Sequence, residues 1–259
     1  MTERNDDAWD GAAPRRASPI LLGVLVLAAL AVLLSLGTWQ LQRLAEKEAL
    51  IARVAERINA APEALPARAD WPALQADQIE FRRVEFEATF RHDDEVHVFI
   101  TLGAPKGPIG GQGYFVVTPA DLADGTVVFV NRGFVPLAAK DPATRAGGQV
   151  EGPQQITGLI RPPEPGTWVT PAADVTRNVW FSRDPAAMAA ARAIPADRVA
   201  PFTVDQERAA LPGGLPQGGE TLVSFPNSHL QYAVTWYGLA AALVAVYASF
   251  LFNGRRRRG

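Results

Sequence analysis

Two long uncharged apolar runs, one near each end of the chain, constrain its fold more than any other feature. Residues 17–42 carry no charged side chain, and residues 232–252 form the second run. A helix needs about 20 apolar residues, at about 1.5 Å of rise per residue, to cross a bilayer. Both runs are long enough, so we predict transmembrane helices at residues 19–40 and 230–252.

The first run differs from a signal peptide, although Arg15 and Arg16 precede it. A signal peptide has an apolar region of about 7–15 residues that ends at a small-residue cleavage site. This run is longer and continues into a helical pattern at residues 41–61, where Leu44, Ile51 and Val54 recur on one face before Pro62. We therefore interpret it as an uncleaved anchor that continues outward as an amphipathic helix.

Arginines flank both predicted spans on the same side. Arg15 and Arg16 precede the first span, and residues 255–258, all arginine, follow the second. Basic residues near the ends of a span favour the cytoplasmic side of the membrane. We therefore expect a disordered cytoplasmic tail at 1–18, a basic cytoplasmic tail at 253–259 and an extracytoplasmic domain at 41–229.

The middle of the chain predicts short strands punctuated by Gly and Pro. An Asp124-Gly125 turn favours a hairpin, and Asp184 before Pro185 predicts the N-cap of a short helix. The expected strands cover residues 80–90, 96–100, 114–118, 126–130, 155–160, 178–182 and 201–204. The predicted fold class is therefore α+β, with two transmembrane helices flanking one antiparallel β domain, barrel-like or a sandwich.

Composition argues against several classes of function. A formal net charge of −2 gives no electrostatic case for nucleic acid, and the absence of cysteine excludes thiol chemistry. No phosphate-binding loop, zinc-protease motif or nucleophile elbow is present. Ser228 and His229 are adjacent, and neighbouring residues of a helix point about 100° apart, which argues against a catalytic pair. We expect no enzyme activity and no nucleic-acid partner, and we expect contact with membrane lipid.

The chain has three histidines, and two of them lie close together in the middle. His92 and His97 flank Asp93, Asp94 and Glu95. Such a cluster could hold a metal in a hairpin turn, but two surface histidines around a polar turn is the favoured interpretation.

The third histidine, His229, lies at the mouth of the second predicted span. On a helix it shares one face with Tyr232 and Trp236. Trp39, Gln40 and Arg43 lie at the matching depth of the first span. The two helix mouths could therefore form a pocket for a haem, with His229 as iron ligand, Arg43 on a propionate, and Trp39, Tyr232 and Trp236 as walls. From these residues alone, an ordinary interfacial aromatic belt is the favoured interpretation.

Seven blocks of sequence follow one another along the chain: LGTWQLQR at 36–43, EFRRV at 80–84, GYFVVTP at 113–119, VNRGFVP at 130–136, GLIR at 158–161, WFSRD at 180–184 and HLQYAVTWYGL at 229–239. In this order they resemble the Surfeit locus protein 1 family of cytochrome c oxidase assembly factors. Ser228 and Phe134 depart from that family, which usually has Asn and often Trp at these places.

The resemblance implies a β domain between two spans and a role in maturing the haem-copper (aa3-type) oxidase. It implies haem a as a transient cofactor, with the closing-block histidine, His229, as its ligand, and oxidase subunit I and haem a synthase as partners. A scaffold that holds oxidase subunits without a cofactor is the alternative. An acidic N-terminus unlike an organelle presequence places the chain in a bacterial inner membrane.

Overall fold

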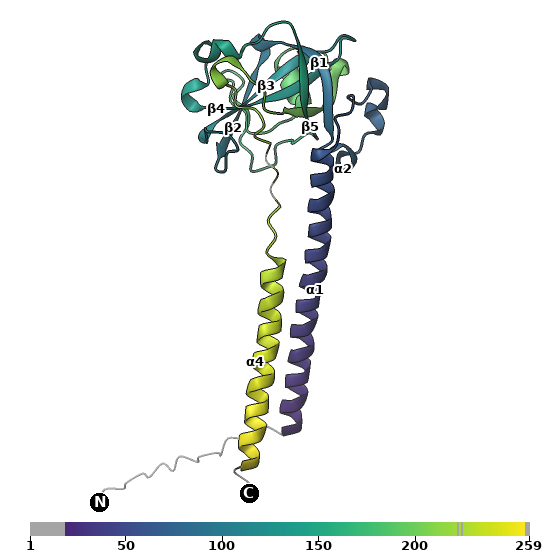
Figure 1. The fold of residues 1–259 in the computed structure, drawn as a ribbon, viewed down its shortest axis with the longest axis vertical. Coiled ribbons are helices and arrows are strands. Elements are labelled where there is room, and N and C mark those ends of the chain that lie inside the picture. Colours follow the sequence, from purple (N-terminus) through teal and green to yellow (C-terminus); the bar gives the residue numbers. More distant parts are fainter. Residues whose placement is uncertain (1–18, 222, 224, 257–259) are drawn as a thin grey trace, which may run out of the picture. The chain divides into compact units, whose positions relative to one another are not determined.

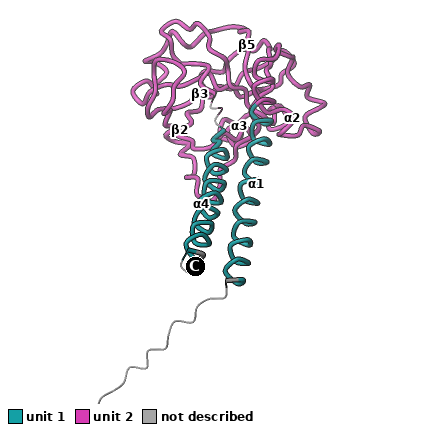
Figure 2. Tube along the Cα trace, turned by 60° about the horizontal axis from the view of Figure 1, so that its bottom comes forward, with its two compact units in different colours: residues 1–51, 225–259 teal, residues 52–224 magenta. Residues whose placement is uncertain are grey.

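A computed structural model describes residues 19–221, 223 and 225–256, and the chain divides into two compact units. Residues 1–51 with 225–259 form the first unit, and residues 52–224 form the second (Figure 2). The predicted N-terminal tail, Arg15, Arg16 and residues 257–259 lie outside the described residues.

The first unit is built from two helices long and apolar enough to cross a membrane. Helix α1 spans Pro19–Asn59 and helix α4 spans His229–Arg256 (Figure 1). Helix α1 runs without a break from the apolar run into the amphipathic segment, as predicted, and ends shortly before Pro62. Most apolar side chains of both helices are exposed, as expected for surfaces that face lipid.

The two helices pack antiparallel along a seam of alternating three- and four-residue spacing. This spacing is typical of coiled-coil packing, in which each seam residue faces the partner helix. The least exposed positions repeat in this way on both helices: Val26, Leu30, Leu33, Gly37, Gln40 and Leu44 on α1, and His229, Ala233, Trp236, Ala240, Leu243 and Tyr247 on α4. The seam therefore decides which side chains of the two helices meet.

The second unit is a six-stranded sheet that closes on itself (Figure 1). The order β1-β5-β6-β4-β3-β2 is completed by a β1–β3 pairing at Phe90 and Ala120, so five strands form a ring and β2 pairs with β3 beside it. The barrel-like alternative of the prediction is confirmed. The strands are β1 Arg83–Phe90, β2 Val96–Leu102, β3 Gly111–Asp121, β4 Val127–Pro136, β5 Pro153–Arg161 and β6 Val199–Gln206.

The prediction of an entirely antiparallel sheet is wrong at one pair of strands. Strands β4 and β6 run parallel, with Val130 opposite Val204. Parallel neighbours need a long crossover, and here the chain between them contains β5 and residues 162–198. Alternation of side chains along a strand carries no information on the direction of its neighbour.

The predicted strand at 178–182 is also absent. Asn178 adopts a positive φ of 51°, which interrupts an extended run, and the segment makes only isolated bridges. One bridge joins Trp180 to Val98 of β2, and the Trp180 side chain is buried in the domain core.

Two local predictions are confirmed. The backbone of Leu122 donates to the carbonyl of Thr126 at 2.8 Å across the Asp124-Gly125 turn, which joins β3 to β4. Asp184 caps helix α3, Pro185–Ala191, by accepting from the backbone N–H of Ala186. The remaining short helices are α2 Ala76–Ile79 and the 3₁₀ turns Arg68–Ala73, His92–Asp94, Leu137–Ala139, Pro142–Gly148, Ala196–Arg198 and Pro212–Gly214.

Candidate functional site

The candidate site lies at the start of α4, where a polar segment passes into the apolar helix. The backbone N–H of Tyr232 donates to the carbonyl of Ser228 at 3.2 Å, and the N–H of His229 lies 3.4 Å from the side-chain oxygen of Asn227. Side-chain oxygens at this position satisfy backbone donors that have no partner inside a helix. The helix therefore begins at His229, whose side chain occupies the first seam position.

The imidazole of His229 is held by Gln40 of α1. Its Nδ1 atom lies 2.8 Å from the amide oxygen Oε1 of Gln40, whose side chain belongs to a residue only 9% exposed. A carbonyl oxygen only accepts hydrogen bonds, so Nδ1 is the donor in this contact. The Nε2 atom has no hydrogen-bond partner among the described residues.

Tyr237 and Gly37 set the register that brings Gln40 to His229. A Cβ atom at Gly37 would lie 2.8 Å from Cζ of Tyr237, so only glycine lets the ring rest against α1. The Tyr237 hydroxyl is also 3.0 Å from Oγ1 of Thr38, which donates in turn to the carbonyl of Leu34. This contact lies about one turn from Gln40 on α1, so it limits sliding of the two helices.

The other predicted site residues lie around this contact in different settings. Arg43 forms an ion pair with Glu46 at 2.8 Å, and its guanidinium lies 5.7 Å from the ring centre of Trp39. Trp39 is 47% exposed and Tyr232 is 52% exposed, whereas Trp236 is half-buried on the seam. The haem pocket made from these side chains stays a prediction.

Gln40 is the residue of this site that the sequence did not single out. The sequence puts Gln40 at the depth of His229, but the predicted pocket uses its neighbours Trp39 and Arg43. The signal that could have found it is the seam spacing, because Gln40 follows Gly37 by three residues and precedes Leu44 by four. A polar residue at such a position faces the partner helix.

An apolar groove of about 600 Å³ runs between α1 and α4 beyond this point. The groove is lined by Ala29, Val32, Leu33, Leu239, Ala242, Leu243 and Val246. Almost all of its surface is hydrocarbon. The α4 residue of the groove that is nearest in sequence to His229, Leu239, lies ten positions further along the helix, roughly 15 Å away at 1.5 Å per residue, so the groove is separate from the imidazole contact. What fits a haem at His229 is a ring nitrogen without a described hydrogen-bond partner, set between two apolar helices.

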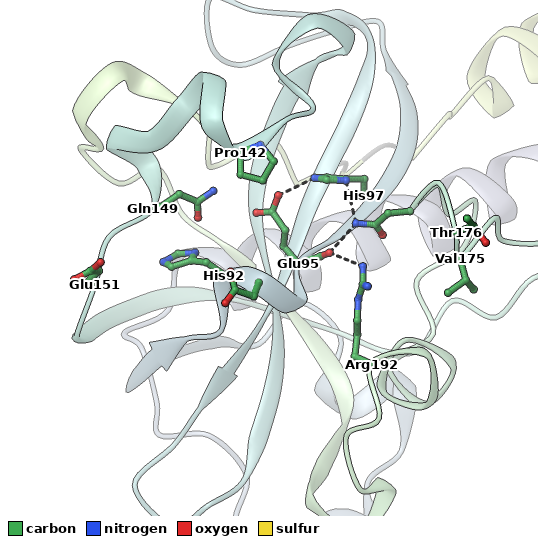
Figure 3. Close-up of a pocket in the computed structure, with 11 residues that line it drawn as sticks. His92, Glu95, His97, Pro142, Gln149, Glu151, Val175, Thr176 and Arg192 are labelled. Carbon is green, nitrogen blue, oxygen red and sulfur yellow. Dashed lines mark hydrogen bonds and ion pairs between the residues drawn. The ribbon is translucent and has the colours of Figure 1, made fainter.

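The β domain contains a second cavity, of about 520 Å³, lined by polar side chains (Figure 3). Glu95 accepts from Nε2 of His97 at 2.9 Å and from the guanidinium of Arg145, while Asn178 lies 3.2 Å from Nδ1 of His97. His97 is 4% exposed, so the prediction of two surface histidines is wrong for it. Its hydrogen-bond partner Glu95 is also buried. The mostly polar residues 92–97 are typical of a surface turn in the sequence, so this burial could not be predicted from them.

His92 lines the same cavity, and both of its ring nitrogens are also engaged. Its Nε2 lies 2.8 Å from the carbonyl of Val150, and its Nδ1 lies 3.2 Å from the guanidinium of Arg132. No group of three or more metal-binding side chains occurs among the described residues. The metal-site alternative therefore finds no support in this part of the chain.

Burial shifts the pKa values of several ionisable groups in and near the second cavity. Burial lowers the pKa of Arg132 to about 10, and burial, with Arg132 alongside, lowers the pKa of His92. Burial opposes ionisation of Glu95, but the hydrogen bonds from His97 and Arg145 outweigh it and hold the pKa of Glu95 below its usual value. The hydrogen bonds among Glu95, His97, Arg145 and Asn178 thus connect β2, the 142–148 turn and residue 178. We assign this network a structural role.

Polar residues of two sequence blocks support the barrel in the same way. Asn131 of β4 donates to Asp205 of β6 at 2.9 Å, and Arg183 donates to the same carboxylate at 2.7 Å. Arg183 also donates to Glu164 at 2.7 Å. These side chains tie together strands that are distant in sequence, so the blocks at 130–136 and 180–184 serve the fold.

The described structure defines a class: two apolar helices that could cross a membrane, at either end of a closed β domain, with an engaged histidine where the second helix begins. Comparison with known proteins makes the class specific. Residues 27–241 match the SURF1 family, and the chain belongs to that family.

Individual relatives cover most of the chain. A SURF1-like protein of Monosiga brevicollis is 37% identical over 235 residues, which is 88% of this chain and 87% of that protein. Surfeit locus protein 1 of Homo sapiens is 39% identical over 219 residues, covering 80% and 70%, respectively. Surfeit locus protein 1 of Xenopus tropicalis is 34% identical over 252 residues, covering 93% and 79%.

Proposed function

We propose that this protein is an assembly factor for the aa3-type cytochrome c oxidase. It binds haem a transiently at His229 and assists its insertion into subunit I. The observation that carries the proposal is the imidazole of His229 at the start of α4, which contacts Gln40 of α1 through Nδ1 and has no described partner on Nε2. Membership of the SURF1 family supports the part of the proposal that assigns this protein to oxidase assembly.

Residues at the start of α4 and the facing residues of α1 would hold different parts of the cofactor. His229 would supply a nitrogen ligand for the iron, and Trp236 on the same seam would offer an aromatic surface. The Arg43 guanidinium lies 5.7 Å from the ring centre of Trp39 on α1, and about half of the Arg43 side chain (51%) is exposed, so it could also pair with a propionate. Haem a itself would supply the iron and the apolar ring. The protein performs no covalent step, so we propose no enzyme activity.

The membrane setting follows from charge and helix length. Arginines flank the outer ends of both apolar segments, which favours cytoplasmic termini and a periplasmic β domain in a bacterial inner membrane. In that orientation His229 lies at the periplasmic mouth of α4. Haem a synthase, as donor, and subunit I, as acceptor, are the proposed partners, together with membrane lipid.

Haem occupancy tests the proposal. Wild-type protein and the His229→Ala variant are purified from cells that make haem a, and the bound haem is measured by its optical spectrum. We expect haem in the wild type and at least a tenfold lower occupancy in His229→Ala. Gln231→Ala is the matched control, because Gln231 lies two residues away on an exposed part of α4. A wild type without haem, or full occupancy in His229→Ala, refutes ligation by His229.

One observation favours the second candidate, a cofactor-free scaffold for oxidase subunits. Gly238 lies away from the seam, and a Cβ atom there would meet nothing within 4 Å. Such a small residue lets the helix of a partner protein approach closely. Normal assembly of haem-replete oxidase in a His229→Ala strain would favour the scaffold over the haem carrier.

A further inference from the structure

We infer that Gln40 is a positioning residue for His229: it fixes the proton on Nδ1 and presents Nε2 to the haem iron. The part of this inference that concerns iron rests on the proposed function. The part that concerns the imidazole stands on the contact between α1 and α4 alone.

The tautomer of His229 follows from the nature of its partner. The amide oxygen of Gln40 accepts a hydrogen bond and has no proton to give, so the contact at 2.8 Å needs the proton on Nδ1. Histidine ligands of metals commonly donate their second ring N–H to an oxygen, which orients the ring and selects the free nitrogen. Gln40 supplies that oxygen from the other helix.

The other two histidines show that this arrangement is particular to His229. Arg132 can only donate to Nδ1 of His92, and the carbonyl of Val150 can only accept from its Nε2. Asn178 lies against Nδ1 of His97, and the carboxylate of Glu95 accepts from its Nε2. These partners place the proton on Nε2 in both rings, and His229 is the described histidine whose Nε2 has no hydrogen-bond partner.

The surroundings of Gln40 make the contact selective. Its side chain lies on a seam whose nearby positions, Leu33 and Leu44, are apolar, and the residue is 9% exposed. An unpaired amide in such a place is costly, so the pairing with His229 is favoured. The Thr38–Tyr237 hydrogen bond, at 3.0 Å, keeps the helices in the register that this pairing needs.

The first test reads the tautomer in the full-length protein in detergent, without haem. Nitrogen-15 labelling of histidine gives three imidazole signals, and His229→Gln assigns the signal of interest. We expect the proton of His229 on Nδ1, and those of His92 and His97 on Nε2. The Gln40→Leu variant lacks the acceptor oxygen, so the nitrogen signals of His229 should no longer show the proton fixed on Nδ1. In Gln40→Glu, which keeps an oxygen at the same reach, the signal should be retained.

The second test measures binding of purified haem a to the same proteins by optical titration. Loss of an outer-shell partner commonly weakens metal binding by about 10–100-fold, and we expect a loss of this size in Gln40→Leu and recovery in Gln40→Glu. Gln42→Leu is the matched control. It replaces a glutamine of the same helix whose side chain is exposed and off the seam, so binding should match the wild type.

The outcomes separate this inference from the proposed function. A wild-type His229 with its proton on Nε2 overturns the inference, as does a Gln40→Leu variant that keeps both the tautomer and the haem affinity. If the wild type shows the expected tautomer but binds no haem, the contact is supported and its role toward iron is overturned together with the proposed function.

Discussion

At the scale of single residues, the three histidines differ because their hydrogen-bond partners differ. His97 lies between a buried carboxylate and an amide, His92 between a carbonyl and a guanidinium, and His229 against an amide oxygen with one nitrogen free. An imidazole with both nitrogens engaged is unavailable as a ligand. The same residue type is thus structural twice in the β domain and a candidate ligand once.

We predict that acid destabilises the β domain through His92 and Glu95. The folded state lowers the pKa of His92 below 6.5, so the unfolded chain binds a proton first as the pH falls, and the stability from neutral His92 is lost below about pH 6.5. The pKa of Glu95 is also lowered, so its contribution is present above pH 4.5 and lost as the pH falls further. Arg132, Arg145 and Glu95 are the charges that act on His92.

Hydrogen exchange of the β4 amides in full-length protein measures this dependence. Protection should fall between pH 7.5 and 5.5, after correction for the intrinsic exchange rate, and His92→Gln should flatten that fall. His229→Gln, which changes a histidine of the helical unit, should leave the slope as in the wild type. An unchanged slope in His92→Gln would contradict the assignment.

At the scale of elements, the register of α1 against α4 decides which side chains face each other at the seam. Spacing of three and four residues recurs on both helices, and the Gly37–Tyr237 contact selects one alignment among those that this repeat allows. A shift by one repeat would move Gln40 away from His229. Helix pairing therefore has a chemical consequence at the site.

We predict that Gly37→Val disturbs this register. Its side chain would enter the space of the Tyr237 ring, and overpacking of this kind commonly costs about 1–3 kcal/mol. The measured effect should be loss of the Nδ1–H signal of His229 and about a tenfold weaker binding of haem a.

Gly238→Val provides the matched control for this change. It places the same side chain on α4 where nothing lies within 4 Å, so both measurements should match the wild type. Equal behaviour of the two variants would show that Gly37 does not hold the register. Impaired oxidase assembly in a Gly238→Val strain, with normal haem binding, would instead support the scaffold function.

At the scale of the whole molecule, the two units serve different requirements. The helical unit has apolar side chains exposed over most of its length, whereas the β domain buries three apolar clusters, of which the larger two contain Phe202 and Phe129. A bilayer can cover the first kind of surface, and water is compatible with the second. The fold is thus consistent with a membrane protein that has one folded domain outside the bilayer.

We predict that both termini are cytoplasmic and that the β domain is periplasmic. A reporter enzyme that works only in the cytoplasm should be active when it is fused after Gly259, and a reporter that works only in the periplasm should be inactive there. The chain has no cysteine, so a single cysteine introduced at the exposed Trp168 can be labelled without background. A membrane-impermeant maleimide should label Trp168→Cys in spheroplasts, and periplasmic activity of the reporter would reverse the orientation.

Several elements of this fold were predictable because their signals are local. Uncharged apolar runs predict helices α1 and α4. The Asp124-Gly125 turn predicts the β3–β4 hairpin, and Asp184 before Pro185 predicts the start of α3. Each depends on residues within a few positions of one another. The parallel β4–β6 pair and the irregular segment around Trp180 depend on chain crossings and on a positive φ at Asn178, which no local pattern encodes.

The sequence by itself determined that two apolar segments lie at either end of a β domain, and that His229 stands where the second of them begins. Length, hydropathy and turn residues are properties of the chain, so these conclusions needed no coordinates. Only the tertiary structure decided that Gln40, 189 residues away, meets the imidazole. A hydrogen bond depends on atoms within about 3 Å, and helix packing alone brings these two side chains that close.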